Sequence, residues 1–218
     1  NDYNREVIAV PGRFGDEYSE GCNFLIESNR AHILSSVKTI AKLMDWNERV
    51  TEISLFTNEE NISKKLKGIK AIVVPGGFGT RGTEGKILAA KYAREHEIPY
   101  FGICLGMQIA VIEYARNVCG ISDANSGEFD ELCKHKVIDF MPGQSDEIDK
   151  GGTLRLGAYP CVITPGTTME KCYEAVEISE RHRHRYEFNN DYRDIVTENG
   201  LCLSGMSPDK RLIETVEL

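Results

Sequence analysis

A short apolar run that ends at a cysteine between small residues constrains the fold more than any other feature. Residues 100–108 read Tyr-Phe-Gly-Ile-Cys-Leu-Gly-Met-Gln, and a helix-forming sequence follows Cys104. A strand that turns this sharply into a helix exposes one side chain at the edge of a sheet, and it needs glycine where the turn is crowded. The helix dipole and the free N–H groups of the first turn favour the thiolate, which attacks carbonyl carbon. The segment therefore predicts a nucleophile elbow.

A glycine turn elsewhere in the chain bears on the role of Cys104. Cysteine at the end of a strand is usually a buried core residue, so Cys104 alone leaves both interpretations open. The apolar run 71–74 also ends in a turn, Pro-Gly-Gly-Phe-Gly at 75–79. Acyl transfer through a thioester needs N–H donors for the oxyanion, one after the nucleophile and one from a neighbouring loop. The two turns together favour the catalytic interpretation, although turn chemistry alone also explains Gly77.

Short apolar runs alternate with helical periodicity, which is typical of a parallel sheet with helices on both faces. This pattern predicts strands at 7–10, 53–56 and 71–74, and helices at 33–44, 61–66, 85–97 and 109–116. After about residue 130, turns are frequent and β-branched runs are short, as at 161–164 and 212–216. We expect an antiparallel extension there. The length of 218 residues suits a single domain.

The composition narrows the function classes. A net charge of −8 argues against a nucleic-acid-binding surface. The seven cysteines show neither a paired framework nor metal-ligand spacing, so we expect no metal site and a reducing, cytoplasmic location. No apolar stretch approaches the length of a membrane span, and we expect no membrane association.

Five segments resemble a known family. They read PGGFGTRG at 75–82, GICLGMQ at 102–108, NSGEF at 125–129, GGTLRLGAY at 151–159 and ERHRHRYEFN at 180–189. Together they resemble the glutaminase (class I glutamine amidotransferase) domain of CTP synthase. The first two are shared by many class I amidotransferases, and the last two are more specific. The resemblance implies an α/β, flavodoxin-like sandwich with a mostly parallel central sheet, a nucleophile elbow and an antiparallel extension, and it makes residues 1–218 one glutaminase domain.

The resemblance also implies roles for single residues. Cys104 would attack the side-chain amide of L-glutamine, release ammonia and form a γ-glutamyl thioester that water hydrolyses. Gly77 and Leu105 would supply the N–H groups of the oxyanion hole. Glu128 would pair with the α-ammonium group of glutamine, and Arg185 would hold its α-carboxylate. Residues implied to line the glutamine site are Gly77, Leu105, Gly106, Met107, Gln108, Glu128 and Arg185. Without the motif match, a Glu or Arg is ordinarily a solvated surface residue.

The basic run 181–186 has competing interpretations. A nucleic-acid patch conflicts with the acidic balance of the chain, and a metal site lacks carboxylate or thiolate partners at close spacing. In an extended segment, alternation places His182 and His184 on one face and the arginines on the other. We therefore expect an anion-binding loop in which the histidines are structural.

A general base is the element that the sequence does not supply. The family takes it from a His-x-Glu element near the C-terminus, and no His-x-Glu occurs among these residues. We expect that element to lie beyond Leu218. The alternative is a catalytically incomplete glutamine-binding or regulatory module that lacks the triad His and Glu. A cysteine hydrolase or chaperone-like protein on a similar elbow fold is a further alternative.

The partners implied by the resemblance lie outside this chain. CTP synthase joins the glutaminase to an N-terminal ATP-dependent synthetase domain that uses the ammonia to convert UTP to CTP. No phosphate-loop motif of the Gly-x4-Gly-Lys-Ser/Thr type occurs here, so we expect the synthetase domain to be absent from this chain. ATP, Mg²⁺, the activator GTP and homo-oligomerisation are expected for the whole enzyme, and no cofactor is expected for the domain itself.

Overall fold

The computed structural model describes residues 8–9, 32–33, 59–140 and 155–218, and the chain divides into the units Asn1–Glu52 and Ile53–Leu218. In the first unit, strand β1 (Ile8–Ala9) pairs in parallel with β2 (His32–Ile33), which confirms a strand within 7–10. The prediction that Ile33 begins a helix is wrong, because its backbone pairs with Ala9. The rest of the predicted helix 33–44 and the predicted strand 53–56 lie outside the described residues.

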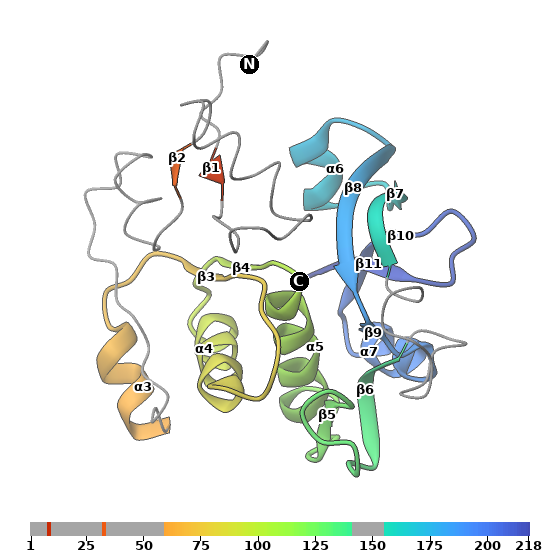
Figure 1. The fold of residues 1–218 in the computed structure, drawn as a ribbon. Helices are drawn as coiled ribbons and strands as arrows, with labels where there is room; N and C mark the ends of the chain where they lie inside the picture. Colours follow the sequence, from red (N-terminus) through yellow and green to blue (C-terminus); the bar gives the residue numbers. More distant parts are fainter. Residues whose placement is uncertain (1–7, 10–31, 34–58, 141–154) are drawn as a thin grey trace. The chain divides into compact units, whose positions relative to one another are not determined.

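The second unit opens with alternating helices and strands (Figure 1). They are α3 (Glu59–Leu66), β3 (Ile72–Val74), α4 (Thr83–Glu95), β4 (Tyr100–Gly102) and α5 (Leu105–Asn117). β3 and β4 pair in parallel, and α4 packs against α5. These elements confirm the predicted strand at 71–74 and the predicted helices near 61–66, 85–97 and 109–116.

Apolar periodicity explains how these elements pack. Ile72 and Val74 of β3 are buried while Val73 is exposed, so the strand buries one face, against α3 and α4. α4 contributes small side chains to the same cluster, Ala89 and Ala93. The helix α5 contacts α4, β3, β4, β5 and β6. Because neighbours surround it on several sides, apolar residues cover much of its circumference.

A three-stranded sheet follows, with the order β5-β6-β9. β5 (Ala124–Ser126) pairs in parallel with β6 (His135–Phe140), which pairs antiparallel with β9 (Tyr186–Phe188). Phe140 and Tyr186 face each other across β6 and β9, and their rings stack at 4.6 Å. This sheet is where the later part of the chain meets α5.

The remaining strands form a four-stranded antiparallel sheet in the order β11-β10-β7-β8. Its strands are β7 (Arg155–Ile163), β8 (Glu177–His184), β10 (Cys202–Met206) and β11 (Ile213–Glu217), and short helices α6 (Thr168–Tyr173), η1 (Asn190–Tyr192) and α7 (Arg193–Glu198) lie between them in the chain. The predicted antiparallel extension is confirmed. No helix in the described ranges is both long and apolar enough to cross a membrane.

Candidate functional site

Cys104 stands at the junction of β4 and α5, in a strained backbone conformation. Its φ is 56° and its ψ is −108°, an angle pair that a residue with a side chain rarely adopts. Glycines on either side make the sharp turn possible. A Cβ at Gly106 would overlap the carbonyl oxygen of Val74, and one at Gly102 would lie 2.5 Å from the carbonyl group of Gly106. The strand can therefore pass close to the helix only where these side chains are missing, as an elbow requires.

The glycine turn after β3 lies against the elbow. A Cβ at Gly76 would contact the Cβ of Cys104 at 3.5 Å, and the side chain of Leu105 lies beside Gly77. The backbone N–H groups of Leu105 and Gly77 both hydrogen-bond to the Cys104 sulfur and lower its pKa. The turn and the first residue of α5 thus bring two N–H donors to one place, next to the reactive atom.

His184, the last residue of β8, contacts the same sulfur. Burial raises the pKa of the Cys104 thiol, but the hydrogen bond and charge of His184, with the two N–H groups, lower it below its usual range. Burial lowers the pKa of His184, but its hydrogen bonds to Cys104 and Glu187 outweigh this and raise it to about 10. The site therefore pairs a thiol of lowered pKa with an imidazole of raised pKa, and these are the directions that favour the reactive thiolate.

A carboxylate completes the arrangement. Nδ1 of His184 lies 3.5 Å from Oε1 of Glu187, whose side chain is 5% exposed. A nucleophile, an imidazole and a carboxylate in this sequence are the parts of a nucleophilic triad. The sequence analysis did not expect His184 and Glu187 to lie against Cys104, and the His-x-x-Glu spacing at 184–187 was the signal for them. The expectations that the general base belongs to a His-x-Glu element beyond Leu218 and that the histidines of this run are structural stay predictions.

The Glu128 side chain is hydrogen-bonded to the glycine turn. Its Oε1 accepts a hydrogen bond from the Gly79 N–H at 2.7 Å, and its own N–H donates to Oγ of Ser126 at 3.1 Å. The half-buried carboxylate is thus fixed beside the loop that supplies Gly77. Its position fits the predicted role toward an ammonium group, which stays a prediction.

Arg185 and Gln108 lie where β9 meets α5. The Arg185 guanidinium stands over the Phe140 ring, 4.9 Å from its centroid. Gln108 is buried and donates from Nε2 to the Tyr186 carbonyl at 2.9 Å, which joins the first turn of α5 to β9. Gly106 is buried and Met107 half-buried in the same turn. His184, Leu105 and Gly77 thus contact Cys104 directly, whereas Glu128 reaches the glycine turn through Gly79.

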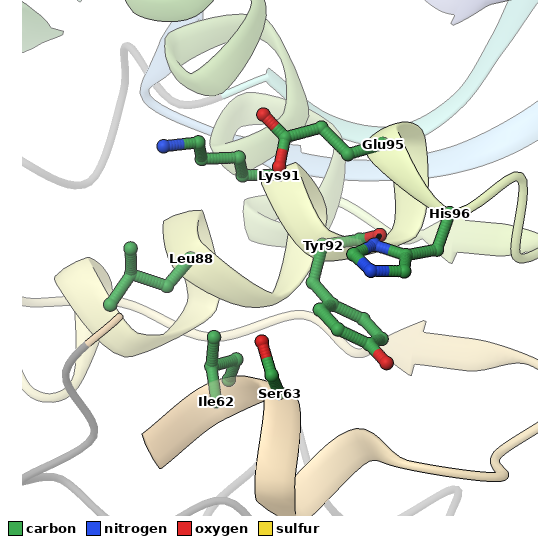
Figure 2. Close-up of a pocket in the computed structure, with 7 residues that line it drawn as sticks. All are labelled: Ile62, Ser63, Leu88, Lys91, Tyr92, Glu95 and His96. Carbon is green, nitrogen blue, oxygen red and sulfur yellow. Dashed lines mark hydrogen bonds between the residues drawn. The ribbon is translucent and has the colours of Figure 1, made fainter. Parts of the chain in front are cut away.

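The remaining features of the described residues offer no competing site. No group of three or more His, Cys, Asp or Glu side chains there is arranged to hold a metal ion. Figure 2 shows a hollow between α3 and α4, lined by Ile62, Ser63, Leu88, Lys91, Tyr92, Glu95 and His96. Within it the Tyr92 and His96 rings stack at 3.9 Å. It contains neither a nucleophilic thiol nor any predicted site residue.

In a comparison with protein families, the class-I glutamine amidotransferase family matches residues 25–218. Among curated proteins, the CTP synthase of Caldanaerobacter subterraneus subsp. tengcongensis is 58% identical over 161 residues, which is 74% of this chain and 30% of that protein. The CTP synthase of Trichormus variabilis is 60% identical over 152 residues, or 70% of this chain and 28% of the relative. The chain thus spans less than a third of the length of these relatives.

Among solved structures, the glutaminase domain of Trypanosoma brucei CTPS with bound acivicin matches with a TM-score of 0.69 and 33% identity, over 98% of this chain and 81% of that one. The resemblance found in the sequence motifs and the class I amidotransferase fold are therefore confirmed.

Proposed function

The chain belongs to the class-I glutamine amidotransferase family, and we propose that it hydrolyses L-glutamine as the glutaminase domain of a CTP synthase. The observation that carries this proposal is the position of the Cys104 sulfur, which contacts His184 and the N–H groups of Leu105 and Gly77, all of which lower its pKa. A charged nucleophile beside an acid and two N–H donors is suited to acyl transfer.

In the acylation half, the Cys104 sulfur attacks the side-chain carbonyl carbon of glutamine and forms a C–S bond. The carbonyl electrons move to oxygen, and the N–H groups of Gly77 and Leu105 donate to that oxyanion. The resemblance assigns the proton transfers to a His-x-Glu element that does not occur in this sequence; for the chain as given we assign them to His184, the histidine among the described residues that contacts the sulfur. It protonates the departing nitrogen, the C–N bond breaks, and ammonia leaves a γ-glutamyl thioester.

In the deacylation half, neutral His184 takes a proton from water, and the oxygen attacks the thioester carbon. The same N–H groups stabilise the second oxyanion, the C–S bond breaks, and glutamate is released. The sulfur recovers its negative charge and His184 its proton. Glu187 keeps the ring oriented through both halves, because its carboxylate faces Nδ1.

We assign recognition of glutamine to two charged groups, one beside the glycine turn and one directly after His184 in the chain. Glu128 would bind the α-ammonium group, and Arg185 would bind the α-carboxylate with two parallel hydrogen bonds. In the whole enzyme, ammonia would pass to an ATP- and Mg²⁺-dependent synthetase domain that converts UTP to CTP. GTP would activate that enzyme, which would act as a homo-oligomer.

The test is labelling of the chain with acivicin, an electrophilic glutamine analogue that the solved relative binds. We expect one adduct by intact mass, mapped to the peptide of Cys104, and steady release of ammonia from glutamine. Cys104→Ala abolishes both while glutamine still binds by calorimetry, because the binding groups remain. Undiminished hydrolysis by Cys104→Ala would overturn the mechanism.

The binding residues provide the matched variants. We expect Glu128→Ala and Arg185→Ala each to raise the dissociation constant of glutamine by roughly tenfold or more, since each removes a charge-assisted contact. Glu177→Ala, which changes an exposed residue on β8, is the control and should leave the dissociation constant of glutamine and the rate of ammonia release unchanged. Binding of glutamine without any adduct or ammonia would select the alternative of a non-catalytic binding module.

A further inference from the structure

A stacked pair of aromatic rings contacts both segments that carry the predicted glutamine-binding charges. Phe140 ends β6 and Tyr186 begins β9, and their rings stack at 4.6 Å with 29° between the ring planes. The two residues are directly opposite each other in the register of these strands. Cross-strand aromatic pairs stabilise a sheet in this arrangement. The pair therefore forms a fixed aromatic surface at one end of the three-stranded sheet.

The guanidinium group of Arg185 packs on this surface. Its Cζ lies 4.9 Å from the centroid of the Phe140 ring and 5.8 Å from that of the Tyr186 ring, and both distances are within the range of a cation–π contact. A guanidinium that packs on a ring uses its flat face, whereas its N–H donors lie in its plane. The rings therefore orient the plane of the donors without taking up the donors themselves.

The same rings contact the segment of Glu128. Gly127 lies against the Tyr186 ring, since a Cβ at this glycine would be 3.6 Å from Cε1 of the tyrosine. The Gly127 N–H donates to the carbonyl group of Ile138 at 2.9 Å, which joins the segment to β6. Glu128, the next residue, is therefore held by the sheet whose aromatic surface carries Arg185.

Gln108 joins the strand that follows Arg185 to the helix that follows the nucleophile. Its buried side chain donates from Nε2 to the Tyr186 carbonyl at 2.9 Å. Because α5 begins directly after Cys104, this hydrogen bond fixes the start of β9 relative to the sulfur. The backbone next to Arg185 is thus held independently of the aromatic rings. What the rings add is the direction of the guanidinium group.

We propose that Phe140 is a positioning residue that holds the Arg185 guanidinium in the orientation in which it meets the α-carboxylate of an amino-acid substrate. This inference rests on the proposed function, which assigns the carboxylate to Arg185. Two parallel N–H···O bonds require the guanidinium and the carboxylate to lie in one plane. An arginine without the ring samples more directions, and the side-chain freedom that it then loses on binding weakens the complex. Phe140 itself needs no contact with glutamine.

Two substitutions of Phe140 separate the effect of the ring from that of apolar bulk. Phe140→Tyr keeps an aromatic face, whereas Phe140→Met keeps a large apolar side chain without one. The readout is the second-order rate constant of Cys104 labelling by acivicin, which carries an α-amino-acid head group as glutamine does. We expect Phe140→Met to lower this constant about fivefold, as the loss of a partly exposed cation–π contact should. We expect Phe140→Tyr to stay within about twofold of the wild-type chain.

Three controls distinguish the orientation of Arg185 from a general loss of structure. Iodoacetamide also alkylates Cys104 but has no amino-acid head group, so its rate should be the same in Phe140→Met and in the wild-type chain. In an Arg185→Ala background, Phe140→Met should have no further effect on acivicin labelling, because there is no guanidinium to orient. Tyr92→Met, which removes the ring stacked on His96, should leave acivicin labelling unchanged.

The outcomes separate this inference from the proposed function. An unchanged acivicin rate in Phe140→Met overturns the inference, and so does an equal loss in Phe140→Tyr, an equal loss with iodoacetamide or a further loss in the Arg185→Ala background. If Phe140→Met does not fold by circular dichroism, Phe140→Leu takes its place with the same expected results. A wild-type chain that shows the predicted pattern of labelling but releases no ammonia from glutamine refutes the proposed function and leaves this inference standing. A wild-type chain that neither binds glutamine nor reacts with acivicin overturns both.

Discussion

At the scale of single residues, Cys104 and His184 depend on each other for their charges. The raised pKa of His184, to about 10, means that it binds its proton more tightly in the folded protein. Its contribution to stability is fully present below the unfolded value of about 6.5 and is lost as the pH rises through the folded value. The lowered pKa of Cys104 contributes stability that is present above about 8.5 and lost as the pH falls. Between roughly pH 8.5 and 10 the contribution of His184 falls, while that of Cys104 rises only slightly toward its full value.

The loss of the His184 contribution above pH 8.5 should be measurable as a loss of stability. We expect the free energy of unfolding, relative to that of His184→Gln, to fall between pH 8.5 and pH 10 by on the order of 1 kcal/mol. Urea unfolding of both proteins at the two pH values measures it. The variant serves as the control because the groups that titrate in this range, apart from Cys104 itself, are common to both. A difference that is equal at both pH values would show that His184 is not held as an imidazolium.

At the scale of elements, one buried carboxylate couples the helix in front of the elbow strand to the helix behind it. The side chain of Glu113 on α5 is 3% exposed, and it accepts from Nε of Arg94 on α4 at 3.0 Å and from Nη2 at 2.8 Å. Removal of one member of a buried pair leaves a charge without compensation. The pair therefore resists separation of α4 from α5, the helix that begins directly after Cys104.

Loss of Arg94 should lower the stability of the folded chain. We expect Arg94→Met to lower the free energy of unfolding by about 2 kcal/mol, since Glu113 stays buried without its partner. Arg211→Met is the matched control: it breaks a pair with Asp209 in which both side chains are exposed, and it should cost less than about 1 kcal/mol. Urea unfolding near neutral pH compares them. Equal effects would mean that the burial of Glu113 contributes nothing to the pair.

At the scale of the whole molecule, the fold gives one thiol a different reactivity from the rest. Six cysteines lie in the described residues, and all are free thiols. Burial raises the pKa of Cys119, Cys133, Cys161 and Cys202, and that of Cys161 reaches about 11. The pKa of Cys104 is lowered, because the end of β8 brings an imidazole to the start of α5.

Selective labelling follows from this contrast. At pH 6.5 an ordinary thiol is only about 1% ionised, so among these six we expect Cys104 to react with iodoacetamide at least about tenfold faster than the others. Peptide mapping over time measures the rates. Cys172 is the control for access, because it is exposed. Labelling of Cys172 as fast as Cys104 would show that exposure, not ionisation, governs the reaction.

The sequence predicted the elements that carry a strong local pattern. The apolar runs before the turns at 75–79 and 103–106 became β3 and β4, and the periodic segments became α3, α4 and α5. β5, β9 and β10 were missed because each is short and mixes polar with apolar residues, so only their pairing with neighbours makes them strands. The start of the predicted helix at Ile33 was wrong for the same reason, since pairing with Ala9 overrides helical periodicity.

The sequence by itself determined the elbow, the glycine turn beside it and the family, because strand, turn and helix are encoded by residues that are neighbours in the chain. The structure alone decided which histidine meets Cys104. His184 is 80 positions from that cysteine, and it reaches the sulfur because β8 pairs with β7 and ends beside α5. The side chains behind that histidine, Arg155, His182 and Glu187, likewise contact one another only because β7, β8 and β9 converge. Hydrogen bonds and charges act over a few ångströms of space, and no spacing along the chain expresses those distances.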